Sequence, residues 1–226
     1  MLVEIQNLLG KEDVAQIRTL SGQGPWLDGA STTGTALQNA KKNAQLDRAC
    51  AGWATIEQAL FQALGSSQDV LRAARPAKLG GLMISRYEPG DLYGEHFDNA
   101  LLPIPGGFRT DLSFTVFLSD PETYDGGALE IDLRGNGEHF EAFKPKAGDA
   151  VLYPTDRLHR VSEVTKGERL AAVGWIQSHV RSVEDREVLS DLEEVAKTLY
   201  QADPSDPKAR KALRVFHHLM RRWSDH

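Results

Sequence analysis

The middle of this chain is a series of short segments rich in β-branched and aromatic residues. Between about residue 79 and residue 180 they read LGGLMISRYEP, DLSFTVFLS, GALEIDL, EHFEAFKP, DAVLYP, HRVSEV and RLAAVGWIQS. Turn signals such as PGD, DGG, RGNG and KAGD separate them. Many short strands without helices between them favour a barrel or a jelly roll over a parallel α/β sheet. We therefore predict a mainly β fold for this part of the chain.

Helical patterns flank the β-rich stretch on both sides. After a strand in the first few residues, apolar side chains recur at helical spacing in residues 11–20, 55–64 and 67–74. The intervening residues 21–49 are rich in Gly, Thr and Asn and predict a long irregular segment that could fold over a site as a lid. After His179, two apolar stripes joined by the turn ADPSDP predict a helical hairpin.

These patterns divide the chain of 226 residues into three predicted regions, within one large domain or one domain with appendages. They are a helical and irregular support region at 1–78, a β domain at 79–180, and a helical extension at 181–226. The helical extension could cap the sheet or form a contact between two copies of the chain, so a homodimer through these helices is one expectation.

The charge and cysteine content exclude several classes of partner. The net charge of −6, with basic residues scattered along the chain, argues against nucleic acid. No apolar run approaches the roughly 20 residues that a membrane span needs, and no signal peptide is evident. Cys50 is the single cysteine, so no disulfide framework within the chain can form. We expect a cytoplasmic protein in a reducing compartment.

A candidate metal site begins in residues 93–100, which read YGEHFDNA. In an extended backbone, His96 and Asp98 point to the same side because side chains alternate between faces. The later strand DAVLYPTDRLHRV adds His159, 63 residues after His96. Two His and one Asp leave three positions of an octahedral Fe(II) ion open, as in the facial triad of non-haem iron oxygenases. Zinc is the competing ion, but a structural zinc site normally has a fourth protein ligand.

A candidate anion-binding residue follows the triad. Arg169 lies ten residues after His159, in the strand ERLAAVGW, and a guanidinium can hold a carboxylate through two hydrogen bonds. Because consecutive strands pair in a jelly roll, a residue at this offset can return to the cavity of the triad. The combination of H-x-D, a distal His and a basic residue ten positions further on is more specific than any single element.

With these residues in place, the sequence resembles a known family. The runs SRYEPGDLYGEHFDN, RTDLSFTVFLSDPETYDGGALEI and KAGDAVLYPTDRLHRVSEVTKGER are similar to the prolyl-4-hydroxylase-type 2-oxoglutarate dioxygenases, and more narrowly to the bacterial PKHD-type hydroxylases. The specific match covers about residues 80–180, and a weaker similarity extends over nearly the whole chain.

The resemblance implies a fold, a cofactor set and a reaction. The fold is a double-stranded β-helix, and Fe(II) is held by His96, Asp98 and His159. Arg169 grips the distal carboxylate of 2-oxoglutarate, and O2 converts this co-substrate to succinate while a substrate C–H bond is hydroxylated. Ascorbate, as a reductant for mis-oxidised iron, is implied by the resemblance alone. The family's association with iron uptake suggests a siderophore or an iron-transport protein as substrate, whereas its name suggests a prolyl or lysyl side chain.

Two further residues are expected to help bind 2-oxoglutarate. The family often uses a Tyr at the position of Tyr87 for a hydrogen bond to the co-substrate, although core packing would also explain it. Many relatives carry a second Tyr where this chain has Phe117, which offers no hydroxyl. Arg169 therefore needs another helper, for which Thr115 is the candidate. Gly126 and Gly127 are expected to serve turn geometry or a close backbone approach.

Competing readings concern both residues and function. A second H-x-E pair, His139 and Glu141, is expected on a solvent face, because strand alternation would turn Phe140 inward. His217 and His218 are expected to face solvent or an interface. Two other functions remain open: a cupin-like metal-dependent dioxygenase or isomerase that does not use 2-oxoglutarate, and a non-catalytic jelly roll that senses iron or binds a ligand. The orientation of Arg169 toward or away from the triad discriminates between the enzyme classes.

Overall fold

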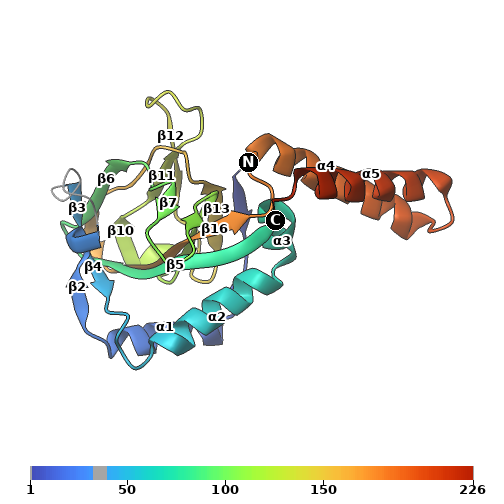
Figure 1. The fold of residues 1–226 in the computed structure, drawn as a ribbon. Coiled ribbons are helices and arrows are strands. Elements are labelled where there is room, and N and C mark those ends of the chain that lie inside the picture. The colour runs from blue at the N-terminus through green and yellow to red at the C-terminus, as the bar shows by residue number, and fades with distance from the viewer. Residues whose placement is uncertain (1, 33–39, 226) are drawn as a thin grey trace.

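The computed structural model describes residues 2–32 and 40–225, and its centre is a sandwich of two antiparallel sheets (Figure 1). The larger sheet has seven strands in the spatial order β1 (Val3–Ile5), β13 (Ala150–Pro154), β9 (Leu112–Phe117), β16 (Arg169–Ser178), β5 (Pro76–Tyr87), β4 (Ala44–Leu46) and β2 (Trp26–Asp28). The smaller sheet has five, in the order β12 (Phe140–Phe143), β11 (Leu129–Asp132), β14 (His159–Val161), β6 (Leu92–His96) and β3 (Lys41–Lys42).

Two short ribbons complete the β structure. One pairs β7 (Leu101–Leu102) with β8 (Phe108–Arg109), and the other pairs β10 (Tyr124–Gly126) with β15 (Val164–Gly167). The second ribbon relies on glycine: Gly126 and Gly127 have φ values of 71° and 61°, and a Cβ on Gly126 would lie within van der Waals overlap of the Glu163 carbonyl oxygen. Both expectations for this glycine pair, turn geometry and close approach, are met.

The predicted helices cover one face of the larger sheet. α1 (Lys11–Gly22), α2 (Trp53–Ser66) and α3 (Gln68–Ala74) pack their buried apolar side chains against it, and Figure 1 shows α2 lying along β5. α3 begins where Ser67 caps it, the Oγ atom accepting a hydrogen bond from the Val70 amide. A second core, which includes Phe117, Ile131 and Tyr153, lies between the two sheets. The jelly-roll fold with N-terminal helices packed on the sheet is therefore confirmed.

The helical hairpin after His179 is also present. α4 (Val183–Ala202) begins at the cap residue Ser182, and α5 (Pro207–Trp223) begins at the cap residue Asp206 with proline in its first turn. The two helices extend away from the sandwich (Figure 1). Arg75 anchors them by an ion pair to Glu193. No helix in the described residues is both long enough and apolar enough to cross a membrane.

The prediction of a long irregular segment at 21–49 is partly wrong. Within it, β2 and β4 extend the seven-stranded sheet and β3 extends the five-stranded sheet, while Gly29–Thr32 form a short 3-10 helix, η1. These strands have only two or three residues each, too few for a period of two to stand out. Residues 33–39, which belong to the lid that the sequence suggests, lie outside the described residues.

Candidate functional site

The residues predicted to bind a metal converge at one end of the sandwich. His96 ends β6, His159 begins the neighbouring strand β14, and the two are directly opposite each other in the antiparallel register. Asp98 lies in the loop two residues after His96. One ligand atom from each of the three residues lies within 4.8 Å of the other two. Strand pairing therefore brings together two imidazoles that are 63 residues apart in the sequence.

Backbone carbonyl groups hold both imidazoles in one tautomer. The Nδ1 atom of His96 lies 2.8 Å from the Gly94 oxygen, and that of His159 lies 2.9 Å from the Arg157 oxygen. Since a carbonyl oxygen can only accept, each Nδ1 carries a proton, and in a neutral ring this leaves the lone pair on Nε2. The Nε2 atoms lie 3.8 and 3.7 Å from the Asp98 carboxylate. Burial, with a contribution from His159, lowers the pKa of His96 to about 4, so it is neutral at physiological pH.

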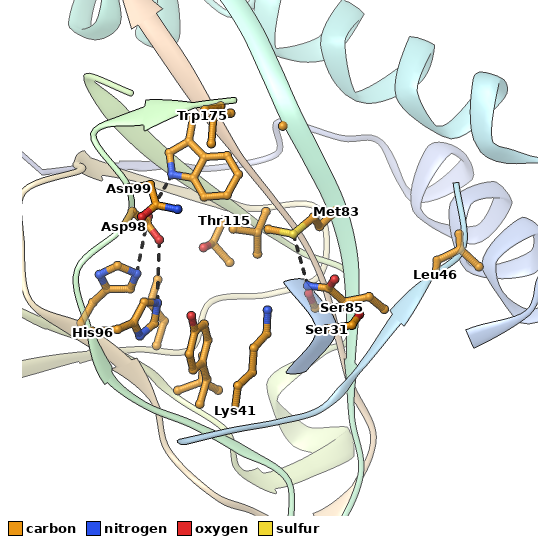
Figure 2. Close-up of a pocket in the computed structure, with 18 of the residues that line it drawn as sticks. Ser31, Lys41, Leu46, Met83, Ser85, His96, Asp98, Asn99, Thr115 and Trp175 are labelled. Carbon is orange, nitrogen blue, oxygen red and sulfur yellow. Dashed lines mark hydrogen bonds and ion pairs between the residues drawn. The ribbon is translucent and has the colours of Figure 1, made fainter. Parts of the chain in front are cut away.

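Two donors from the larger sheet hold the carboxylate of Asp98. Its Oδ2 atom accepts a hydrogen bond of 2.8 Å from the Ser113 hydroxyl and one of 2.9 Å from the Trp175 indole. Figure 2 shows the second of these bonds. Such outer contacts orient a ligand and tune its basicity. The sequence analysis missed both residues. Trp175 could have been found, because it lies six positions after Arg169 and strand alternation places even offsets on one face.

The donor set fits Fe(II). Two imidazole nitrogens and one carboxylate oxygen are the ligands of a facial triad, which leaves coordination positions for a co-substrate and O2. A structural zinc site would have a fourth protein ligand. Among residues 2–32 and 40–225, the triad is the one group of three or more His, Cys, Asp or Glu side chains with converging ligand atoms.

The triad opens into a cavity of about 590 Å³, a volume typical of small-molecule sites. Arg169, the first residue of β16, also lines this cavity, so its side chain faces the triad's pocket rather than away from it. Its guanidinium lies 5.0 Å from the ring centre of Tyr87 and 5.4 Å from that of Phe117. Tyr87 is the cross-strand partner of Arg169, which is why the two residues meet.

Arg169 carries donors that nothing in the described protein satisfies. The residue is 1% exposed, and neither its Nε nor its Nη1 atom has a hydrogen-bond partner among the described residues. Buried polar groups are nearly always paired, so an unpaired buried cation indicates a binding site for an anion. A carboxylate with two oxygens matches the geometry of a guanidinium.

A residue that the sequence analysis did not consider lies beside this arginine. Tyr124 and Arg169 both pack against Gly127, where a Cβ would come within 3.1 Å of each side chain. The buried Tyr124 hydroxyl interacts with the Arg169 guanidinium, and no other hydrogen-bond partner for it lies among the described residues. Burial raises the pKa of Tyr124, so the hydroxyl keeps its proton and remains a donor. By contrast, the hydroxyl of Thr115, the helper suggested by the sequence, is hydrogen-bonded to Tyr153.

Three other histidines, His139, His217 and His218, lie where the sequence analysis expected them. His139 and Glu141 are exposed, while Phe140 between them is partly buried. His217 and His218 are exposed on α5. None of the four belongs to the cluster of converging ligand atoms.

Replacing Trp175 by phenylalanine tests the support of Asp98. The change removes one donor to Oδ2 but keeps an aromatic ring, so we expect affinity for Fe(II) to fall by about 10- to 100-fold while the melting temperature changes little. Anaerobic metal titration measures the first quantity and circular dichroism the second. Trp223→Phe, on α5, is the matched control and should bind the metal like wild type; equal affinities in both variants would contradict this role for Trp175.

Comparison with known proteins agrees with this geometry. Residues 82–177 match the family model described as the 2OG-Fe(II) oxygenase superfamily. A PKHD-type hydroxylase of Maricaulis maris is 41% identical over 225 residues, which cover 100% of both chains.

Solved structures share the fold at low sequence identity. A Pseudomonas putida prolyl-4-hydroxylase superimposes with a TM-score of 0.52 and 19% identity, over 78% of this chain and 92% of that one. The non-haem α-ketoglutarate-dependent epimerase SnoN from nogalamycin biosynthesis gives a TM-score of 0.57 and 18% identity, over 79% and 78%.

Proposed function

This chain belongs to the PKHD-type hydroxylases of the 2OG-Fe(II) oxygenase superfamily, and on that premise we propose that His96, Asp98 and His159 hold the iron at which it hydroxylates a substrate. The protein is a dioxygenase that uses Fe(II) and 2-oxoglutarate. Membership of this family favours that function over a cupin-like enzyme without 2-oxoglutarate and over a non-catalytic module. The main observation behind the site assignment is that His96, His159 and Asp98 converge. Backbone carbonyl groups orient both imidazoles, and Ser113 and Trp175 orient the carboxylate.

We assign the distal carboxylate of 2-oxoglutarate to Arg169 and Tyr124. Two buried donors without partners, Nε and Nη1 of Arg169, and the Tyr124 hydroxyl beside the guanidinium support the assignment. A carboxylate would satisfy all three, which offsets the cost of burying its own charge. The ring of Tyr87 lies under the guanidinium and keeps it from turning away. In this chain Tyr124 takes the place of the hydroxyl that Phe117 lacks.

The chain's own groups perform four tasks in the reaction. When bound, Fe(II) and 2-oxoglutarate supply the oxidising chemistry that places an oxygen atom from O2 on a substrate carbon and releases succinate and CO2. The two carbonyl groups hold the Nδ1 protons, so that Nε2 stays available as a ligand. Ser113 and Trp175 keep the Asp98 carboxylate oriented. Arg169 fixes one end of the co-substrate, and the apolar walls Leu129, Val161 and Val173 keep water from the pocket.

An anaerobic titration tests the proposed function. Fe(II) and then 2-oxoglutarate are added to the apo-protein while visible absorption is recorded. We expect a charge-transfer band that needs both additions, because that band arises when the keto acid chelates the iron. Consumption of 2-oxoglutarate after admission of O2 provides a second measurement. Iron binding without any spectral response to 2-oxoglutarate would overturn the proposal in favour of a metal enzyme that binds its substrate directly.

Tyr124→Phe tests the second partner of the carboxylate. A hydrogen bond to a charged group contributes about 1.5–3 kcal/mol, so we expect the Kd for 2-oxoglutarate, followed by the charge-transfer band, to rise about 10-fold or more. Affinity for Fe(II) should not change, because Tyr124 is not among the ligands. Tyr200→Phe removes an exposed hydroxyl on α4 and serves as the control. A Kd equal to that of the control would show that Arg169 acts with a different helper.

A further inference from the structure

The exposed large apolar side chains of the described residues gather in two places. Four lie on the helical hairpin: Val188, Val195, Tyr200 and Val215. The other four lie in segments that contribute to the pocket: Leu27, Phe97, Leu101 and Ile104. Three of the latter group line the cavity itself, and Phe97, with 61% of its surface exposed, stands between the ligands His96 and Asp98. An apolar rim around a pocket marks the place where an apolar part of a ligand binds.

Inside this rim lies a buried lysine. Lys41 is on the edge strand β3, directly opposite Tyr93 of β6. Because side chains alternate along a strand, Lys41 is buried and lines the pocket, whereas Lys42 is exposed and contacts Asp91 and the Gly90 carbonyl. Figure 2 shows the Lys41 side chain rising into the pocket.

The ammonium group of Lys41 and the imidazole of the triad residue His96 both contact the ring of Tyr93. The Nζ atom of Lys41 is 4.8 Å from the ring centre of Tyr93, and that ring stacks on the imidazole of His96 at 3.6 Å between centres. An anionic group held by Lys41 would therefore lie close to the metal without being a ligand. The remainder of the same molecule could reach both the iron and the apolar rim.

The charge of the pocket favours an anion. Its lining holds three cationic residues, Lys41, Arg48 and Arg169, and two carboxylates, Asp47 and Asp98, in a chain whose net charge is −6. Of the cations, Arg48 donates to the Leu82 carbonyl and packs over Trp53. Bound Fe(II) and dianionic 2-oxoglutarate cancel each other and leave this balance unchanged. Burial lowers the pKa of Lys41 to about 8, so most of it remains protonated at neutral pH.

We propose that the substrate is a small amphipathic organic anion, with an oxyanion bound by Lys41 and an apolar body lying against Phe97, Ile104 and Leu27. The inference rests on the proposed function and specifies the substrate class of the same site. A cavity of about 590 Å³ holds 2-oxoglutarate together with a second small molecule. In this arrangement Lys41 orients the substrate and is a specificity residue, not a metal ligand.

A pair of fluorescent probes tests the proposal without requiring the natural substrate. Anilinonaphthalenesulfonate is an amphipathic anion, and N-phenylnaphthylamine has nearly the same aromatic body without the charge. Both are titrated anaerobically into the protein loaded with Fe(II) and 2-oxoglutarate. We expect Lys41→Met to weaken binding of the sulfonate by about 10-fold or more, and to change binding of the neutral probe by less than about twofold. Phe97→Ser should weaken binding of both probes.

Two control variants localise the effect. Lys42→Met removes a charge from the adjacent position on the opposite face of β3, and Val195→Ser removes apolar surface from the hairpin; neither should change the affinity for either probe. The inference is overturned if the sulfonate binds Lys41→Met as tightly as wild type, if both probes lose affinity equally, or if Lys42→Met has the same effect.

Measurement of the charge-transfer band distinguishes failure of this inference from failure of the proposed function. A normal band in Lys41→Met, together with loss of sulfonate binding, supports a role in substrate binding. A band lost from Lys41→Met but present in wild type would show that Lys41 serves 2-oxoglutarate, which overturns the inference and leaves the proposed function standing. Absence of the band from the wild-type protein would contradict both the proposed function and this inference.

Discussion

A protein carrying His159→Ala should form no charge-transfer band with Fe(II) and 2-oxoglutarate, and should consume no 2-oxoglutarate. Removal of an outer contact to a metal ligand costs about 10- to 100-fold in affinity, and loss of one of only three ligands should cost more. The fold should persist, because the side chain contacts the pocket and its backbone pairs with β6 and β11 remain available. Isothermal titration measures the affinity for Fe(II), visible spectroscopy measures the charge-transfer band, and circular dichroism reports on the fold.

The second H-x-E pair provides the matched control for this experiment. His139 is exposed and does not belong to the cluster of ligand atoms, so His139→Ala should bind Fe(II) and 2-oxoglutarate like wild type. If instead His139→Ala lost the band and His159→Ala retained it, the assignment of the triad would be wrong.

Arg169→Met should weaken binding of 2-oxoglutarate without lowering the stability of the protein that has no 2-oxoglutarate bound. Breaking a buried, hydrogen-bonded charge pair costs about 3–5 kcal/mol, so affinity for 2-oxoglutarate should fall on the order of 10²- to 10³-fold while Fe(II) still binds. In the absence of 2-oxoglutarate the melting temperature should not fall, because the change removes a buried charge with two unpartnered donor atoms. Addition of 2-oxoglutarate should then raise the melting temperature of wild type but not that of the variant.

Arg86→Met is the control for the arginine. Arg86 lies on the neighbouring strand β5, one residue before Tyr87, so its side chain projects to the opposite face and stacks on Trp26. Its replacement removes a cation close to the site without entering the pocket, and 2-oxoglutarate affinity should stay at the wild-type value. Equal losses in both variants would indicate a general electrostatic effect rather than a clamp at Arg169.

The sequence was sufficient for the features that depend on local pattern. The jelly roll follows from short strands with turn residues between them, and α3 and the hairpin helices follow from apolar spacing and the ADPSDP turn. His96, Asp98, His159 and Arg169 were predicted from their spacing along the chain and from the family resemblance, and the structure brings them to one cavity. The alternation of side chains along β16 would also have predicted Trp175 on the same face as Arg169, but Trp175 was not considered.

Other parts of the site depend on long-range packing that no local pattern encodes. Lys41 enters the pocket from a strand of two residues that exists only because it pairs with the edge of β6. Tyr124 reaches Arg169 because two consecutive glycines with positive φ let the β10 ribbon approach β16 closely. In a single sequence, both residues look like ordinary members of polar turns.

The position of the triad between the two sheets has a mechanical consequence. His96 and His159 belong to the five-stranded sheet, whereas the groups that restrain Asp98, Ser113 and Trp175, belong to the seven-stranded sheet. An ion bound by all three side chains would therefore link the two layers. We expect removal of iron to make the protein more susceptible to proteolysis, because that link is then lost.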